Sequence, residues 1–251
     1  MALYFIGLGL NNEKDISWIG LETIKKCDKV YLDRYTSILN CSVDRLAEVY
    51  GKKIIIATRD LVESEAEQTI LKDAKESEVA FLVAGDPMCA TTHIDLYLRA
   101  RKAGIKIKVI NNASIISAIG ITGLQVYKFG KTTSIPFDNE NVETPYDALK
   151  DNIKMGMHTL FLLDLRPNEH KFMSVNDAIR YLLKIEIRRG ERVFTDKTLC
   201  IGCARIGSDS FKIKKGSANE LLKEDFGNPV QCLVVPGKLH FLEEEALEMW
   251  K

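Results

Sequence analysis

The chain has 251 residues, with 35 basic and 35 acidic side chains and a formal net charge of zero. Without a basic excess, general binding to nucleic acid is not expected. Its 46% of hydrophobic residues is enough to bury a core without disulfides or metals. No apolar run approaches the roughly 18 residues of a spanning helix, and Met1–Ile6 lacks a basic leader, so we expect neither a membrane segment nor a signal peptide.

The first half alternates short apolar runs with helical patterns. Strands are predicted at Leu3–Leu10, Lys29–Leu32, Ile54–Ile56, Val79–Val83 and Ile107–Ile110. The helices between them are predicted at 16–26, 43–50, 61–76 and 92–103, of which the second is capped by Ser42 and ended by Gly51. This alternation predicts a mainly parallel sheet that is covered on both faces.

Residues 111–131 are rich in Gly, Ser and Thr and are interpreted as a connecting segment between an N-terminal domain, 1–110, and a C-terminal domain, 132–251. In the second domain, strands are expected at Thr159–Leu165, Thr198–Arg205, Phe211–Lys214 and Gln231–Val235. A helix begins after Ser174, with Asp177 placed for a capping box. Because few helices separate these strands, antiparallel neighbours are expected. The fold class is therefore α/β, with a ligand cleft expected between the two lobes.

Two loops after predicted strands have features of ligand sites. Gly7-Leu8-Gly9 follows the first strand, but Asn12 stands where a dinucleotide fingerprint needs glycine, so a nicotinamide site is not expected. Gly85-Asp86-Pro87 follows a buried strand. Asp86 either faces a ligand at the carboxyl end of the sheet or forms a turn, and the residues alone leave both open.

The cysteines, histidines and acidic residues indicate no metal site. Cys200 and Cys203 form a CxxC, but their odd spacing on a predicted strand places them on opposite faces. All six cysteines are scattered, mostly in apolar stretches, which is typical of reduced thiols in a cytoplasmic protein. No HxxxH pair occurs, so we predict no metal ligands. The acidic run Glu243–Glu245 is predicted to be a solvated helix face.

Six blocks of the sequence, in order, resemble the diphthine synthase family of the tetrapyrrole (corrin/porphyrin) methylase superfamily. They are Leu3–Leu10, Gly85–His93, Ser114–Ile115 with Ala118–Leu124, Tyr127–Lys131, His158–Leu160 and Val235–His240. The resemblance therefore runs from the first strand nearly to the C-terminus. The length is similar to that of archaeal members.

The resemblance implies a two-domain fold, with a parallel N-terminal sheet, a mixed C-terminal sheet and an active-site cleft between them. It implies a cytoplasmic, homodimeric methyltransferase that uses S-adenosylmethionine and releases S-adenosylhomocysteine. The implied partner is translation elongation factor 2, in which an amino-carboxypropyl histidine is N-methylated to diphthine in diphthamide biosynthesis. No nucleic acid or membrane partner is implied.

The resemblance also implies the residues that bind the cofactor. These are Leu10, Asp86, Cys89, Ser114, Ile115, Leu163, Ile206 and Gln231, and most of them lie at or just past a predicted strand end. The apolar members suit adenine and ribose, Ser114 and Ile115 suit the methionine part, and Asp86 suits a positive amino group or sulfonium. The pattern implies no catalytic residue and no metal. Tyr35 and His93 could face the substrate, but a structural role is favoured for each.

Two alternatives stay open at this point. A precorrin-type methylase of the same superfamily is one, although such enzymes carry Gly-Pro-Gly-Asp where this chain has Gly9-Leu10-Asn11-Asn12. The other is a binding module for S-adenosylmethionine without catalysis, against which the presence of Asp86 and Ser114 speaks.

Overall fold

The computed structural model describes residues 1–251, which form two compact units, Met1–Ala118 and Ile119–Lys251. The N-terminal unit is built on one sheet with the strand order β3-β2-β4-β1-β5, in which every pair is parallel. This confirms the predicted parallel sheet. Its strands are β1 (Ala2–Gly7), β2 (Lys29–Asp33), β3 (Ile54–Ala57), β4 (Glu78–Val83) and β5 (Lys106–Ile110).

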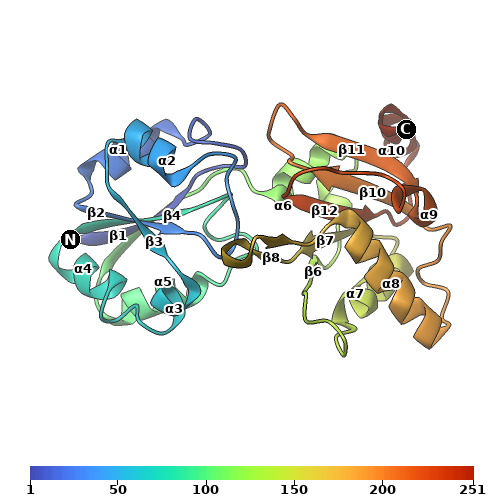
Figure 1. The fold of residues 1–251 in the computed structure, drawn as a ribbon, viewed down its shortest axis with the longest axis horizontal. Coiled ribbons are helices and arrows are strands. Elements are labelled where there is room, and N and C mark those ends of the chain that lie inside the picture. Colours follow the sequence, from blue (N-terminus) through green and yellow to red (C-terminus); the bar gives the residue numbers. More distant parts are fainter. The chain divides into compact units, whose positions relative to one another are not determined.

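Helices cover both faces of this sheet (Figure 1). The helices α1 (Trp18–Lys26) and α2 (Val43–Tyr50) pack on one face, and their buried side chains share a core with Ile6, Leu32 and Leu82. The opposite face carries three helices, α3 (Arg59–Glu63), α4 (Ile70–Glu76) and α5 (Ile94–Lys102), while α6 (Ile115–Ala118) follows β5. Both faces are thus apolar, which explains the near-continuous hydrophobic strands.

One predicted helix of this unit is wrong. The pattern predicts a single helix over 61–76, but the chain forms α3 and α4 with a break between them. Arg99 of α5 explains the break, because its Nη1 donates to the carbonyl oxygens of Val62 (3.1 Å) and Glu63 (3.0 Å). In a continuous helix, these carbonyls would instead accept hydrogen bonds from backbone nitrogens of the next turn. By contrast, α2 has its predicted Ser42 cap and ends at Gly51, at a φ of 65°.

The C-terminal unit contains a mixed sheet with the order β11-β10-β12-β7-β6. Only β6 and β7 are parallel; the other neighbouring strands are antiparallel, as predicted. The strands are β6 (Thr133–Ile135), β7 (Thr159–Leu163), β10 (Leu199–Ala204), β11 (Lys212–Ser217) and β12 (Gln231–Val235). A small hairpin, β8 (Leu165–Arg166) and β9 (Lys171–Phe172), follows β7 around the 3-10 turn η3 (Pro167–Glu169).

The main core of the C-terminal unit lies between its sheet and the helices α7 (Thr144–Lys154), α8 (Val175–Arg189) and α9 (Ala218–Leu221). Ser174 caps α8, and Asp177 completes the predicted capping box. The helix α7 is missing from the sequence-based prediction, although Tyr146 and Leu149 follow a helical spacing after Pro145 at its start.

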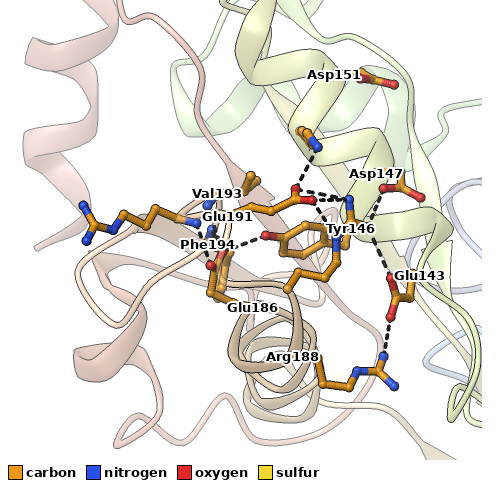
Figure 2. A network of polar contacts seen from close by, with 12 residues as sticks. Glu143, Tyr146, Asp147, Asp151, Glu186, Arg188, Glu191, Val193 and Phe194 are labelled. Carbon is orange, nitrogen blue, oxygen red and sulfur yellow. Dashed lines mark hydrogen bonds and ion pairs between the residues drawn. The ribbon is translucent and has the colours of Figure 1, made fainter.

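A polar network fixes the end of α8 next to α7 (Figure 2). Figure 2 shows the Tyr146 side chain directed at Glu186, whose Oε2 accepts from the tyrosine hydroxyl at 2.7 Å. The same carboxylate accepts from the backbone nitrogens of Arg192, Val193 and Phe194. These bonds hold the pKa of Glu186 below its usual value although burial opposes this. The network therefore shapes the connection from α8 to β10.

The prediction of a solvated Glu243–Glu245 face is wrong for Glu243. In α10 (Phe241–Leu247) this side chain is fully buried, whereas Glu244 and Glu245 are exposed. Its carboxylate accepts from the backbone nitrogen of Gln125 (2.9 Å), from His158 Nε2 (3.0 Å) and from Lys128 Nζ. Burial opposes its charge, but these donors lower the pKa of Glu243 to about 2.

The Glu243 cluster joins three of the sequence blocks that carry the resemblance. Lys128 comes from the 3-10 turn η2 (Val126–Lys128), His158 precedes β7, and Gly237 donates from its backbone nitrogen to His158 Nδ1 at 3.0 Å. The remaining short turns are η1 (Ile119–Thr122) and η4 (Glu248–Trp250), and Trp250 Nε1 donates to the Thr122 carbonyl. No helix of either unit has the length and apolar content that crossing a membrane requires.

Candidate functional site

The loops that follow β1, β4 and β5 meet at the carboxyl edge of the N-terminal sheet. Because β1 pairs with both β4 and β5, the segments after these three strands are neighbours. Gly9 and Gly85 form an isolated bridge, with N–O distances of 3.2 and 2.7 Å. The carboxyl edge of a parallel sheet is where open α/β folds bind ligands.

Glycine is required in these loops for two different reasons. A Cβ on Gly7 would lie 2.6 Å from the Gly85 carbonyl oxygen and 2.8 Å from Asn112 Cβ, so the two loops approach too closely for any side chain. Gly85 has a φ of 81°, and an added Cβ would meet only the Ala113 carbonyl oxygen, at 3.9 Å. Glycine at position 85 is therefore required by its positive φ and not by lack of room for a side chain.

Asp86 forms the turn that the sequence left as one of two alternatives. The side chain is 5% exposed, and Oδ1 accepts from the Met88 backbone nitrogen at 2.8 Å. Oδ2 accepts from Asn111 Nδ2 (3.0 Å) and the Asn112 backbone nitrogen (3.1 Å). Burial opposes ionisation, but these bonds hold the pKa of Asp86 below its usual value. The carboxylate thus joins the loop after β4 to the loop after β5.

Three more of the predicted residues lie around Asp86. The Cys89 thiol contacts both Asp86 and Ser114, and burial together with the Asp86 charge raises its pKa. Ser114 is 6% exposed, and its Oγ accepts from the Ile116 backbone nitrogen at 3.2 Å. Ile115 begins α6 and is partly exposed. Leu10, also partly exposed, directly follows the Gly9 bridge.

The other three predicted residues share one edge of the C-terminal sheet. Leu163 ends β7, Ile206 follows β10 by two residues, and Gln231 begins β12, which runs antiparallel to both strands. Gln231 Oε1 accepts from the Val175 backbone nitrogen at 2.9 Å, and its Nε2 donates to the Gly227 carbonyl at 2.8 Å. The amide therefore holds the start of α8. Five predicted residues are gathered in one unit and three in the other.

Two residues near the carboxyl edge of the N-terminal sheet are not identified by the sequence patterns. Asn112 Nδ2 donates to the carbonyl oxygens of Gly7 and Asp15, both at 3.0 Å, and so fastens the loop after β1. Asp33 ends β2 and is buried beside His93. The position of Asp33 could have identified it, because it ends a buried apolar strand and Asp86 follows such a strand in the same way.

No group of three or more His, Cys, Asp and Glu side chains is arranged to hold a metal ion. All six cysteines are free thiols. Cys200 and Cys203 are both buried in β10, where burial raises the pKa of Cys200, and Cys203 faces Cys232 of β12. The CxxC is thus part of the sheet packing.

Comparisons with known proteins agree on one family. The family description Tetrapyrrole (Corrin/Porphyrin) Methylases matches residues 2–222. The diphthine synthase of Methanocaldococcus jannaschii is 45% identical over 251 residues, which cover 98% of this chain and 97% of that protein. The diphthine methyl ester synthase of Dictyostelium discoideum is 46% identical over 270 residues, covering 100% and 98%.

A solved structure shows the same relationship. The putative diphthine synthase from Entamoeba histolytica matches 100% of this chain and 98% of its own length, with 44% identity and a TM-score of 0.91. The fold and these similarities together define a methylase of the tetrapyrrole methylase class. Within that class, the chain belongs to the diphthine synthase family, which makes it a methyltransferase.

Proposed function

We propose that this protein transfers methyl groups from S-adenosylmethionine to the amine of the amino-carboxypropyl histidine of elongation factor 2. The observation that carries this proposal is the identity of 45 to 47% with diphthine synthases over nearly the whole of both chains. Similarity of that extent to diphthine synthases favours this acceptor over a tetrapyrrole. It also favours an active enzyme over a binding module.

The residues at the carboxyl edge of the N-terminal sheet fit the cofactor. Its adenosine and methionine parts need apolar contact together with backbone and hydroxyl partners, and this edge offers Leu10, Ile115 and Ser114. The close backbone bridge between Gly9 and Gly85 brings these loops together at this edge. Leu163, Ile206 and Gln231 are proposed as further contacts from the edge of the C-terminal sheet.

When bound, the cofactor supplies an activated methyl group on a positively charged sulfur. The contribution of this chain is to hold the loops after β1, β4 and β5 in one arrangement before the cofactor arrives. The bonds from Asp86 and Asn112 to neighbouring loops do this. Positioning of this kind can supply several kcal/mol of a transfer barrier, with effective molarities of roughly 10⁵ M or more in ideal cases.

The proposed protein partner is consistent with the charge of the chain. With a net charge of zero, long-range attraction to nucleic acid is weak, which favours a protein surface that presents one modified side chain. We also propose that the enzyme is a cytoplasmic homodimer, as the family resemblance implies. Size-exclusion chromatography with light scattering tests the dimer.

A second product is favoured by one specific comparison. The Dictyostelium relative, at 46% identity, is named for a methyl ester of diphthine, whereas the Methanocaldococcus relative is named for diphthine itself. A methyl ester requires one further transfer, to the carboxylate of the same side chain. The two products differ chemically, because mild alkali hydrolyses an ester and leaves N-methyl groups in place.

The test is incubation with isotope-labelled S-adenosylmethionine and elongation factor 2 that carries the precursor histidine. We expect label in the elongation factor that carries the precursor histidine. We expect none in the factor with unmodified histidine, which lacks the accepting amine. Mass spectrometry before and after mild alkali then separates diphthine from its methyl ester. Equal labelling of both forms, or labelling of a tetrapyrrole alone, would contradict the proposal.

A further inference from the structure

The C-terminal unit has an exposed apolar surface around α10. Seven large apolar side chains on this surface are 41–79% exposed, namely Ile121, Val126, Tyr127, Met155, Phe241, Leu242 and Met249. At about 200 Å² for a side chain of this size, they present roughly 800 Å² to solvent. The largest apolar patch of a typical monomer is about 300–600 Å², so an area of this size indicates an interaction surface.

Four of these side chains lie beside a stripe of α10. Leu242, Ala246 and Met249 are spaced i, i+4 and i+7, which places them on one side of the helix. Ala246 packs directly on Gly123 and leaves no room for a Cβ there. The stripe therefore lies next to the segment 121–127, which carries the exposed residues of η1 and η2.

Hydrogen bonds hold the segments of this surface together. Trp250 Nε1 donates to the Thr122 carbonyl oxygen at 2.9 Å, which ties η4 to η1. The Lys238 backbone nitrogen donates to the Gly156 carbonyl oxygen at 3.0 Å, which ties the turn after α7 to the segment before α10. The seven side chains therefore lie on one continuous part of the C-terminal unit, which we call the α10 surface.

The charges around the α10 surface are of both signs and are separated along the helix. Lys238 precedes α10, whereas Glu244 and Glu245 lie within it, and all three side chains are exposed. The ion pairs of this region use the neighbouring acids Glu243 and Glu248 instead. Lys238, Glu244 and Glu245 are therefore left without an ion-pair partner in the chain.

This distribution of charge fits a second copy of the chain. A two-fold interface uses the same surface of both subunits, so that surface must complement itself. With two α10 helices antiparallel across the axis, the basic end of each helix lies beside the acidic part of the other. The apolar stripes then face each other, and an apolar centre with a charged rim is the usual anatomy of an interface. The area also matches the roughly 800 Å² per partner of a standard interface.

We propose that the α10 surface is the interface of the homodimer, with the two α10 helices antiparallel about the two-fold axis. This inference rests on the homodimer proposed above and names the surface that forms it. Tyr127 is the most exposed of the seven side chains, at 79%. It is expected to contribute most, because buried aromatic side chains dominate the binding energy of interfaces.

Tyr127→Glu and Leu242→Glu test the interface by placing a charge at its centre. Both positions are exposed in the single chain, so each variant should fold, which circular dichroism verifies. We expect wild type to sediment as a dimer and the dissociation constant of each variant to rise at least roughly thirtyfold. Ile187→Glu is the matched control, since this residue is 84% exposed on α8, which carries no member of the α10 surface. It should dimerise like wild type.

Lys238→Glu and Glu245→Lys test the antiparallel arrangement. Each single variant places like charges opposite each other and should weaken the dimer by roughly fivefold. The double variant places opposite charges together again, so it should recover the wild-type dissociation constant. A double variant that dimerises more weakly than either single variant would refute the arrangement.

Sedimentation and labelling separate failure of this inference from failure of the proposed function. A wild-type dimer that is unchanged by Tyr127→Glu and Leu242→Glu would overturn the interface but leave the homodimer intact. A monomeric wild type would refute both. Variants that stay dimeric but no longer label the precursor form of elongation factor 2 would show that the surface binds the substrate protein instead. If wild type dimerises and the variants do not, the interface is supported, and absence of label would refute only the proposed methyl transfer.

Discussion

At the scale of single residues, Asp86 is the side chain on which the candidate cofactor site depends most directly. Its carboxylate accepts hydrogen bonds from three groups in two loops. Asp86→Ala therefore leaves the nitrogens of Met88, Asn111 and Asn112 without this acceptor. We expect a loss of about 3 kcal/mol in unfolding free energy. We also expect at least a roughly tenfold weaker affinity for S-adenosylmethionine, measured by calorimetry at a temperature where the variant is folded.

Asn111→Ala provides the graded control for Asp86. Asn111 is exposed and supplies only one of the three donors, so the two backbone bonds to the carboxylate survive. Its effects on stability and affinity should be clearly smaller than those of Asp86→Ala. Wild-type affinity in a folded Asp86→Ala protein would remove Asp86 from the site.

Gly130 shows a second residue-scale constraint, in the C-terminal unit. A Cβ at this position would lie 2.2 Å from Asn152 Oδ1. Asn152 is buried and bonds both the nitrogen and the carbonyl of Lys131, as well as the Thr159 hydroxyl. Gly130→Ala should therefore cost about 2 kcal/mol in urea unfolding. In the double variant with Asn152→Ala the two costs should not add, and simple additivity would argue against a clash with Asn152.

At the scale of elements, Arg99 separates α3 from α4. Arg99→Ala removes the donors to the Val62 and Glu63 carbonyls, and we expect a loss of about 1–2 kcal/mol in unfolding free energy. The ion pairs of Arg99 with Glu67 and Asp95 add little, because both carboxylates are largely exposed. Arg101→Ala, on an exposed position of the same helix, should leave stability unchanged. Equal losses in the two variants would mean that Arg99 acts only through its charge.

The elements that the sequence predicts well are those whose signals are local. Ser42 with Gly51, and Ser174 with Asp177, identify helix ends because a cap and a left-handed residue act within one turn. The break between α3 and α4 depends on Arg99, more than thirty positions further along the chain, and no local pattern predicts it. The same holds for Glu243, whose burial depends on donors from Gln125, Lys128 and His158.

At the scale of the whole molecule, alternation of strands and helices predicted the two kinds of sheet and placed candidate residues after strands. It could not predict which polar side chains form hydrogen bonds within the chain itself. Asp86 and Gln231 both form hydrogen bonds with neighbouring loops, and most of these partners are distant in sequence. Asp33 and Asn112 were missed because their roles follow from strand order and loop contact, which a single sequence does not reveal.

Acid stability should reflect the buried Glu243 cluster of the C-terminal unit. Burial lowers the pKa of His158, although its hydrogen bond to Glu243 opposes this. As the pH falls below 6.5, His158 therefore binds a proton more readily in the unfolded chain than in the folded protein. The free energy of unfolding declines as a result. Glu243 has a folded pKa of about 2 against an ordinary 4.5, so its contribution, roughly 3 kcal/mol, is complete above pH 4.5 and is lost as the pH falls towards 2.

This decline can be measured as the free energy of urea unfolding over a series of pH values. Trp250 lies beside the cluster's elements in η4, and Trp18→Phe, at a 75% exposed position, leaves it as the sole tryptophan reporter. Glu243→Gln should be less stable at neutral pH but show a flatter decline between pH 4.5 and 2, because it has no carboxylate to titrate. Glu244→Gln, next to it and exposed, should keep the wild-type slope. Stability that rises on acidification, or equal slopes in Glu243→Gln and wild type, would show that Glu243 does not govern the acid response.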